Sequence, residues 1–182
     1  DVTLSIIKNT VDKAGCKEKV YYNENVYRVS GSTRRFKEIM QTGLECIGDI
    51  DLYDIFETVS LAAQSLALIS KDFVLQISHL GVLSAVLEKI CPEEMFRQKV
   101  IGCMKSKNPH DLSRICREYG VEDTRLMQLV SAYGSRDKVL KKLEALDCGQ
   151  ESVQELKELS RLLDQLPWGR QIVFDFSVVN NM

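Results

Sequence analysis

The spacing of apolar residues changes along the chain, and each change predicts a different kind of element. Near the start the apolar residues recur at helical spacing. Two β-favouring stretches then flank a short basic loop, which is the pattern of an antiparallel hairpin. A wide apolar helix face and a short, nearly continuous apolar strand follow, and such a strand is suited to the middle of a covered sheet. The predicted elements are a helix over 3–13, β-favouring runs at 19–22 and 26–29 around the polar residues 23–25, a loop at 31–35, a strand over 39–47, a helix over 50–70 and a strand over 73–77.

Glycine and short polar residues mark the ends of these elements. Gly15 is a plausible end for the first helix, and Gly48 closes the second strand of the hairpin. Either Asp49 or Asp51 can cap the helix over 50–70, because a carboxylate at that position accepts hydrogen bonds from the first free N–H groups of the helix.

From residue 82 onward the pattern changes to short helices separated by glycine and proline, and a final strand is predicted over 171–179. The order is therefore helix, hairpin, helix, strand, helical block and strand. This order predicts an α+β fold with an all-helical insertion over 82–167, and not the strict alternation of a doubly wound parallel fold. The predicted helices of the insertion cover 82–90, 93–105, 111–119, 123–133, 136–147 and 152–166.

Composition excludes several classes of protein. The 182 residues are 45% hydrophobic and 27% charged, with a formal net charge of −2 and a pI near 5.8. These values are ordinary for a soluble globular protein and argue against binding nucleic acid through bulk positive charge. We identify no apolar run as long as the roughly 18 residues that a membrane span needs, so the sequence does not predict an integral membrane protein. The chain starts abruptly at Asp1, and we expect it to be a fragment of a longer protein.

The cysteines and histidines do not form a metal-binding pattern. No CxxC pair occurs, and only His79 and His110 could supply imidazole, so no metal site is predicted. Several cysteines lie within apolar helical patterns, where a thiol packs as a small hydrophobic group, and we expect free thiols in a reducing cytosol. The six are Cys16, Cys46, Cys91, Cys103, Cys116 and Cys148.

Common catalytic motifs are missing from the sequence. It contains no GxxxxGK or GxGxxG phosphate loop and no GxSxG nucleophile elbow. His79 lies at a strand end, where it is either a base or, in the interpretation that we favour, a structural histidine satisfied by a neighbouring carbonyl. His110 is predicted to be a solvated turn residue. A leucine-rich stripe on the last helix is predicted to be core rather than a partner interface, and it consists of Val153, Leu156, Leu159, Leu162, Leu163 and Leu166.

The hairpin carries the residues most suited to binding a ligand. Positions 41, 43 and 45 fall on one side of a strand because side chains alternate. Gln41 and Glu45 would then face Arg28 of the other strand on a sheet that otherwise looks buried, and buried polar groups are costly unless they are paired. A zwitterionic ligand fits, with a carboxylate or phosphate on Arg28 and an ammonium group on Gln41 and Glu45. The alternative is a salt bridge within the sheet that faces solvent.

These residues also resemble a known family. Asp1-Val2-Thr3 resembles the acidic-x-Thr step that begins a helix in histidyl-tRNA synthetases and their relatives. The hairpin is similar to class II synthetase motif 2 in its histidine-specific form. Residues 172–179 resemble the strand that leads into the histidine-specific motif after the insertion. The quoted motif 2 residues are Tyr27-Arg28, the basic loop, Gln41-x-x-x-Glu45 and Gly48.

The resemblance implies a fold, a division of the chain and a binding site. The fold is a class II synthetase-like antiparallel sheet flanked by helices. A partial core covers 1–81 and 168–182, and the helical insertion covers 82–167. The residues that fall where the family holds the substrate histidine or its reacting carboxylate are Asp1, Thr3, Arg28, Gln41 and Glu45.

The resemblance also indicates a branch of the family that has lost activity. Ser30 stands where synthetases carry an acidic residue that helps to hold adenine, and Asn180 stands where they carry an activating arginine. An amide cannot replace the fixed charge of a guanidinium beside a developing phosphate charge. A synthetase shell of this kind is similar to the regulatory subunits of ATP phosphoribosyltransferase, which support the first step of histidine biosynthesis and its inhibition by histidine.

We therefore expect a non-catalytic, cytoplasmic regulatory subunit that needs no cofactor. The resemblance implies that it forms a dimer, assembles with the short-form catalytic subunit into a hetero-octamer, and has histidine as a possible ligand, without tRNA or a membrane as a partner. The first alternative is an active histidine–tRNA ligase with an unusual motif 2. The second is a synthetase-like paralogue that binds another amino acid or RNA as an accessory factor.

Overall fold

The computed structural model describes residues 2–10, 15–31, 34–105 and 109–177. The chain divides into two compact units, and we describe each by itself. The hairpin unit runs to Ala62, and the helical unit begins at Ala63. The boundary between the two units therefore falls inside one long helix. The division into a synthetase-like core and a helical insertion, which the resemblance places between residues 81 and 82, stays a prediction.

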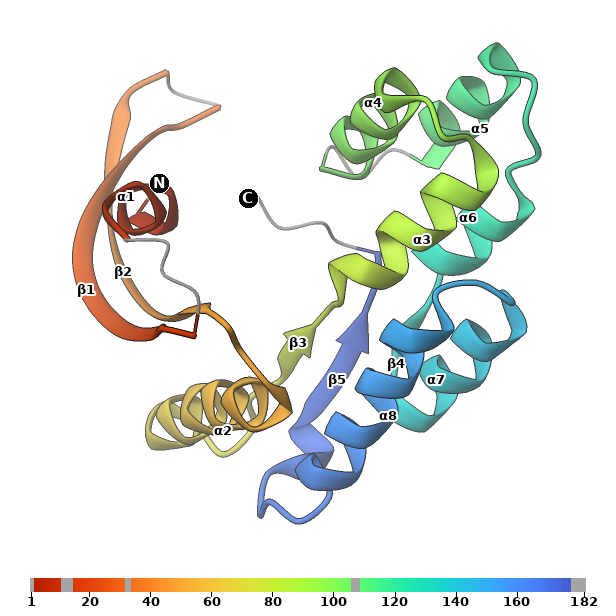
Figure 1. The fold of residues 1–182 in the computed structure, drawn as a ribbon. Helices are drawn as coiled ribbons and strands as arrows, with labels where there is room; N and C mark the ends of the chain where they lie inside the picture. Colours follow the sequence, from red (N-terminus) through yellow and green to blue (C-terminus); the bar gives the residue numbers. More distant parts are fainter. Residues whose placement is uncertain (1, 11–14, 32–33, 106–108, 178–182) are drawn as a thin grey trace. The chain divides into compact units, whose positions relative to one another are not determined.

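The hairpin unit consists of one helix beside a long two-stranded antiparallel sheet, followed by the start of a second helix (Figure 1). The predicted hairpin is confirmed, and its register pairs Lys17 with Gly48 and Val29 with Phe36. Its elements are α1 (Val2–Asn9), β1 (Lys17–Val29), β2 (Phe36–Gly48) and the beginning of α2 (Leu52–Ile69).

The two predicted β-favouring runs form one continuous strand, β1. The polar residues between them, which weakened the strand pattern, pair with β2 and make cross-strand hydrogen bonds. Thr42 Oγ1 donates to Asn23 Oδ1 at 3.0 Å, and Asn25 Nδ2 donates to Glu38 Oε1 at 2.8 Å. Cross-strand partners therefore override the low strand propensity of asparagine.

Asp51 caps α2, as one of the two predicted alternatives. Its Oδ1 accepts hydrogen bonds from the backbone N–H groups of Tyr53 (2.9 Å) and Asp54 (3.1 Å). The side chain of Asp54 accepts in return from the backbone N–H of Asp51 at 3.0 Å. This reciprocal pair is a capping box, which satisfies N–H groups that the first turn leaves free.

An ion-pair network joins the start of α2 to the first residues of β1. Lys17 Nζ contacts carboxylate oxygens of Asp51 (2.8 Å) and Asp54 (2.5 Å), while Lys19 Nζ contacts those of Asp54 (2.9 Å) and Glu57 (2.5 Å). The Asp54 side chain is only 3% exposed. Hydrogen bonds from Lys17, from the Asp51 backbone and from Lys19 hold the pKa of Asp54 well below its ordinary value of 3.8.

We expect the network to make the hairpin unit sensitive to acid. Because the folded pKa of Asp54 is depressed, its stabilising contribution is present above pH 3.8 and is lost as the pH falls through the folded value. In Asp54→Asn, the protection of amides at the β1 end near Lys17 and Lys19, measured relative to exchange in the unfolded chain, should be lower at neutral pH. This protection should also change less between pH 5 and pH 2 than it does in the parent protein. Asp72→Asn, at an exposed aspartate, is the control. Equal pH profiles in the parent protein and Asp54→Asn would contradict this expectation.

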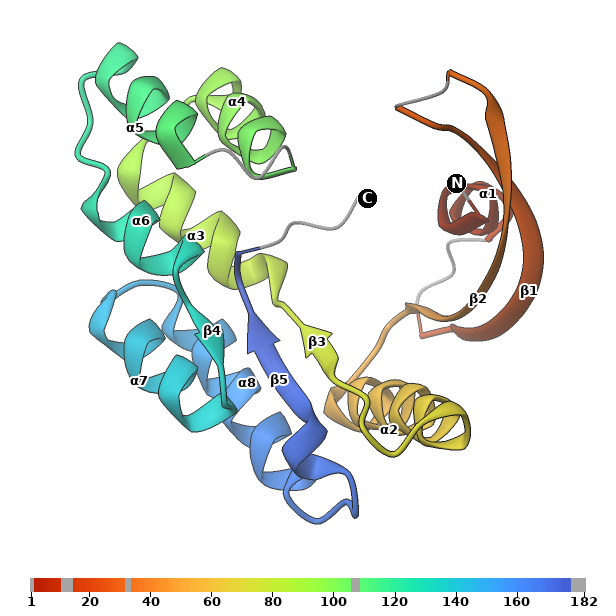
Figure 2. The ribbon, with the colours of Figure 1, turned by 180° about the vertical axis from the view of Figure 1, so that it is seen from behind.

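The helical unit contains all six predicted helices of the insertion, with ends shifted by a few residues. They are α3 (Leu80–Ile90), α4 (Glu94–Lys105), α5 (Pro109–Glu118), α6 (Thr124–Val130), α7 (Arg136–Ala145) and α8 (Gln150–Leu163). Helices α4 and α5 pack as one pair and α7 and α8 as another, with α3 contacting α6 and α8 (Figure 2).

A short mixed sheet lies in the same unit, with strand order β3-β5-β4. The middle strand β5 pairs in parallel with β3 and antiparallel with β4. The prediction that 73–77 lies in the middle of a sheet is wrong for the described residues, because β3 is an edge strand there and the last strand is central. The strands are β3 (Leu75–Ile77), β4 (Tyr133–Gly134) and β5 (Ile172–Asp175), and the turn η1 (Gly169–Gln171) precedes β5.

Residues 131–133 were predicted to continue a helix, but α6 ends at Val130 and β4 follows it. Tyr133 and Gly134 pair with Asp175 and Phe174, and the backbone N–H of Phe176 donates to the carbonyl of Ala132 at 2.9 Å. Pairing with a strand 40 residues further along the chain fixes this segment, so local apolar spacing could not reveal it.

The core of the helical unit is built from the apolar faces of these helices and from β5. The prediction that the leucine stripe is core is confirmed for Val153, Leu156, Leu159 and Leu163, which are buried, while Leu162 and Leu166 are half-buried. All six cysteines are free thiols. Four of them pack in this core as predicted, and burial raises the pKa of three of those four, Cys103, Cys116 and Cys148.

Helix α2 differs from the expectation that no apolar segment is long enough to span a membrane. Its 18 residues have a mean hydropathy of 1.2, so by length and composition it is the one described helix that could cross a membrane. Only 22% of it is buried. Length and composition alone are weak support for a membrane span, because core helices of soluble proteins also have both properties.

Candidate functional site

One face of the hairpin gathers the polar residues that the sequence singled out. Residues that pair directly across an antiparallel ladder project to the same face. Glu45 pairs with Val20, Gly43 with Tyr22, and Gln41 with Glu24, so positions 41, 43 and 45 share one face as expected. We call this surface the Gln41–Glu45 face.

Helix α1 contacts this face at Glu45. Thr3, in the first turn of α1, donates a hydrogen bond from Oγ1 to Glu45 Oε1 at 2.6 Å, and both side chains are half-buried. The two residues are 42 positions apart in the chain. The fold thus brings two of the five predicted site residues together, and the Glu45 carboxylate keeps acceptor capacity for a further N–H donor.

Tyr22 covers the middle of the face. A Cβ on Gly43 would lie only 2.3 Å from Tyr22 Cζ and from its hydroxyl oxygen, so only glycine leaves room for this ring. Gln41 Nε2 donates to the same hydroxyl at 3.1 Å. Sequence reasoning missed Tyr22, although counting outward from the loop of the predicted hairpin would have placed it opposite Gly43.

Arg28 lies on the same face but is not close to Glu45. Arg28 pairs with Lys37, and eight positions of β1 separate it from Val20, the partner of Glu45. At about 3.3 Å per residue that separation is roughly 26 Å. The alternative of a salt bridge between Arg28 and the glutamate is therefore not formed in the described part of the chain. Arg28 is exposed, and with Arg34, Arg35 and Lys37 it makes the loop end of the hairpin positive.

The other predicted positions give a partial picture. Asp1 and Asn180 lie outside the described residues. Ser30 lies at the base of the loop, where its N–H donates to the carbonyl of Arg35 and its carbonyl accepts from the N–H of Arg34, both at 2.9 Å. Backbone hydrogen bonds of Ser30 thus close the loop, and the side chain of Ser30 carries no carboxylate.

His79 and His110 lie outside the hairpin that carries this face. His79 Nε2 lies 3.0 Å from Glu155 Oε2 of α8, and its Nδ1 is buried without a hydrogen-bond partner among the described residues. The structural interpretation of His79 fits this contact, but its partner is a carboxylate and not the expected carbonyl. His110 falls in the first turn of α5, and its side chain lies outside what the structure describes.

The fold and the polar face define a class of protein. The chain belongs to the histidyl-tRNA synthetase family, because a family model described as "Histidyl-tRNA synthetase" matches residues 1–182. The predicted synthetase-like α+β fold is confirmed by solved structures. A regulatory subunit/histidyl-tRNA synthetase from Bacillus halodurans aligns with a TM-score of 0.75 and 22% identity, over 98% of this chain and 47% of that one. The ATP phosphoribosyl transferase (HisG:HisZ) complex from Thermotoga maritima gives 0.69 and 19%, over 97% and 64%.

Curated relatives fall in two branches of this family. A "Histidine--tRNA ligase" from Methanococcus maripaludis is 27% identical over 170 residues, which are 90% of this chain and 40% of the ligase. An "ATP phosphoribosyltransferase regulatory subunit" from Bacillus cereus is 26% identical over 173 residues, or 90% and 41%. The chain thus spans about two fifths of these relatives. The predicted resemblance to regulatory subunits is confirmed, while identity alone does not separate the two branches.

Proposed function

We propose that this chain is part of a non-catalytic regulatory subunit of ATP phosphoribosyltransferase, which supports the first step of histidine biosynthesis and its control by histidine. The observation that carries the proposal is Ser30. It occupies the base of the motif 2 loop without the carboxylate that the synthetase resemblance requires for adenine, while the Gln41–Glu45 face is kept. Asn180, in place of the activating arginine, points the same way.

Histidine would bind on the Gln41–Glu45 face. Glu45, already oriented by Thr3, offers a carboxylate to an N–H donor of the ligand, and Gln41 offers an amide. Tyr22 lies over Gly43 between them, so a ligand that contacts both must stack on this ring or displace it. Asp1 and Arg28 belong to the set by resemblance. About 26 Å of strand separates the positions of Arg28 and Glu45, so Arg28 would not contact the histidine that Glu45 holds.

The partners follow from the same proposal. The subunit would form a dimer and assemble with a short-form catalytic subunit in a cytoplasmic hetero-octamer, without a cofactor of its own and without binding tRNA. The relative in the Thermotoga maritima complex supports pairing with the catalytic subunit. The near-neutral balance of 24 basic and 26 acidic residues supports the absence of a nucleic-acid partner.

Isothermal titration of the intact protein with histidine, alone and with its catalytic partner, tests the site. We expect Glu45→Ala to weaken histidine binding about tenfold or more, because a charge-assisted hydrogen bond is lost. Glu38→Ala is the matched control, since Glu38 lies on the same strand but on the opposite face, paired with Tyr27. Unchanged affinity in Glu45→Ala would remove the site and leave the regulatory role standing.

An active histidine–tRNA ligase remains the second candidate, because the Methanococcus maripaludis ligase matches this chain as well as the regulatory subunit does. A ligase would exchange pyrophosphate with ATP in a histidine-dependent reaction. Robust exchange by the intact protein would overturn the regulatory proposal, and its absence together with stimulation of a short-form transferase would support it.

A further inference from the structure

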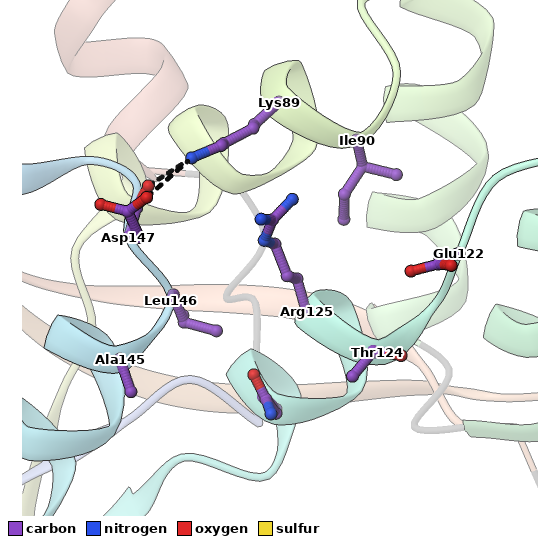
Figure 3. Close-up of a pocket in the computed structure, with 9 residues that line it drawn as sticks. Lys89, Ile90, Glu122, Thr124, Arg125, Ala145, Leu146 and Asp147 are labelled. Carbon is purple, nitrogen blue, oxygen red and sulfur yellow. Dashed lines mark hydrogen bonds and ion pairs between the residues drawn. The ribbon is translucent and has the colours of Figure 1, made fainter.

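A cavity of about 400 Å³ opens in the helical unit, apart from every residue of the hairpin. Its walls come from the C-terminal ends of α3 and α7 and from the start of α6 (Figure 3). Its volume falls in the range of small-molecule sites. The lining consists of Lys89, Ile90, Glu122, Thr124, Arg125, Gln128, Ala145, Leu146 and Asp147.

Two cations converge on this cavity. In Figure 3 the Arg125 side chain extends from α6 toward α3, while the Lys89 side chain runs from α3 to Asp147. Lys89 Nζ is held by the carbonyl of Asp147 at 2.5 Å and lies 3.6 Å from its carboxylate. Arg125 is exposed and forms no ion pair within the described part of the chain. Both cations also act on one thiol: burial raises the pKa of Cys148, and the charges of Lys89 and Arg125 oppose that rise.

Groups of opposite charge lie on the same walls. Glu122, just before α6, also lines the cavity, and no ion pair joins it to Arg125 in the described part of the chain. Helix α7 ends beside the cavity at Ala145 and is followed by Asp147 in the left-handed region (φ 51°). The C-terminal end of a helix carries a partial negative charge that favours a cation. The formal charges of Lys89, Arg125, Glu122 and Asp147 sum to zero.

We propose that this cavity binds a free α-amino acid. Its carboxylate binds Arg125 and Lys89, where a guanidinium can make two parallel hydrogen bonds. Its ammonium group binds Glu122, and the short apolar wall of Ile90 and Leu146 contacts its side chain. Phosphate and other multiply charged anions are disfavoured, because Glu122 and Asp147 would repel them. This site is distinct from the histidine site proposed on the hairpin.

The test is calorimetric titration of the intact protein with the proteinogenic amino acids one by one, and with inorganic phosphate. We expect saturable binding of at least one amino acid that Arg125→Gln weakens about tenfold and Glu122→Gln weakens measurably. Arg161→Gln, at an exposed arginine of α8 away from the cavity, should leave binding unchanged. Circular dichroism of each variant shows that the fold is retained.

The outcomes separate this site from the one on the hairpin. Binding that responds to Arg125→Gln and not to Glu45→Ala supports the proposal. Binding lost in Glu45→Ala and unchanged in Arg125→Gln overturns it and leaves the hairpin site intact. Phosphate binding that competes at Arg125 overturns the assignment to an amino acid. If no amino acid binds to the folded protein, the proposal is also wrong.

Discussion

Phe174→Ala should destabilise the helical unit by about 3–5 kcal/mol, the usual cost of deleting a buried aromatic ring. Phe174 is fully buried in the middle strand of the β3-β5-β4 sheet, where it pairs with Ile77 on one side and Gly134 on the other. Its ring belongs to the same core as the faces of α3 and α6–α8. Removing it leaves a cavity at the point where the sheet and the helices meet.

Urea unfolding of the 182-residue chain measures this effect. Trp168 is the only tryptophan and lies in the helical unit, so its fluorescence reports on that unit. The midpoint should fall while the slope is retained. Phe36→Ala is the matched control, because this ring is 76% exposed on the hairpin, and it should change stability by no more than about 0.5 kcal/mol. A loss below about 1 kcal/mol in Phe174→Ala would contradict the core that we describe.

Gly48→Ala should have the largest effect in the hairpin unit, about 2 kcal/mol of destabilisation. Gly48 has a φ of 117°, a conformation that residues with a Cβ rarely adopt, and such strain costs about 1–3 kcal/mol. A Cβ there would also lie 2.2 Å from the carbonyl oxygen of Cys16, an atom of the backbone that cannot rotate away. The same carbonyl accepts the N–H of Asp49 at 3.2 Å, so the end of the ladder would open.

Amide hydrogen exchange along β1 and β2 measures this second prediction. A loss of 2 kcal/mol corresponds to about thirtyfold less protection at the Lys17 end. Gly31→Ala is the control within the same hairpin, since nothing lies within 4 Å of a Cβ there, and it should leave protection unchanged. Equal protection in both variants would show that Gly48 is not needed for closing the strand.

Residues whose role is local were predicted well. The loop between two β-favouring runs defined the hairpin, and the alternation along β2 placed Gln41, Gly43 and Glu45 on one face. Asp51 was one of two caps suggested for α2, and the structure selects it by two backbone hydrogen bonds. These features depend on neighbours within a few positions, and the periodicities of 2.0 and 3.6 residues read them directly.

Roles that depend on distant partners were not predicted. The sequence did not indicate that Tyr22 covers Gly43, that Glu155 is the partner of His79, or that the last strand is central. It also placed Arg28 with Glu45 as a single clamp, whereas the register separates them along the hairpin. Each of these depends on which segments pair and by how many residues they are offset, and the local sequence pattern does not reveal either.

The sequence by itself determined the order of helices and strands, the hairpin with its polar face and the family resemblance, because local periodicity and motif spacing are properties of consecutive residues. Only the tertiary structure decided that Thr3 binds Glu45, that β5 lies between β3 and β4, and that Lys89 and Arg125 meet at one cavity. Those outcomes are set by packing between segments far apart in the chain, where burial and complementary charge outweigh local preference.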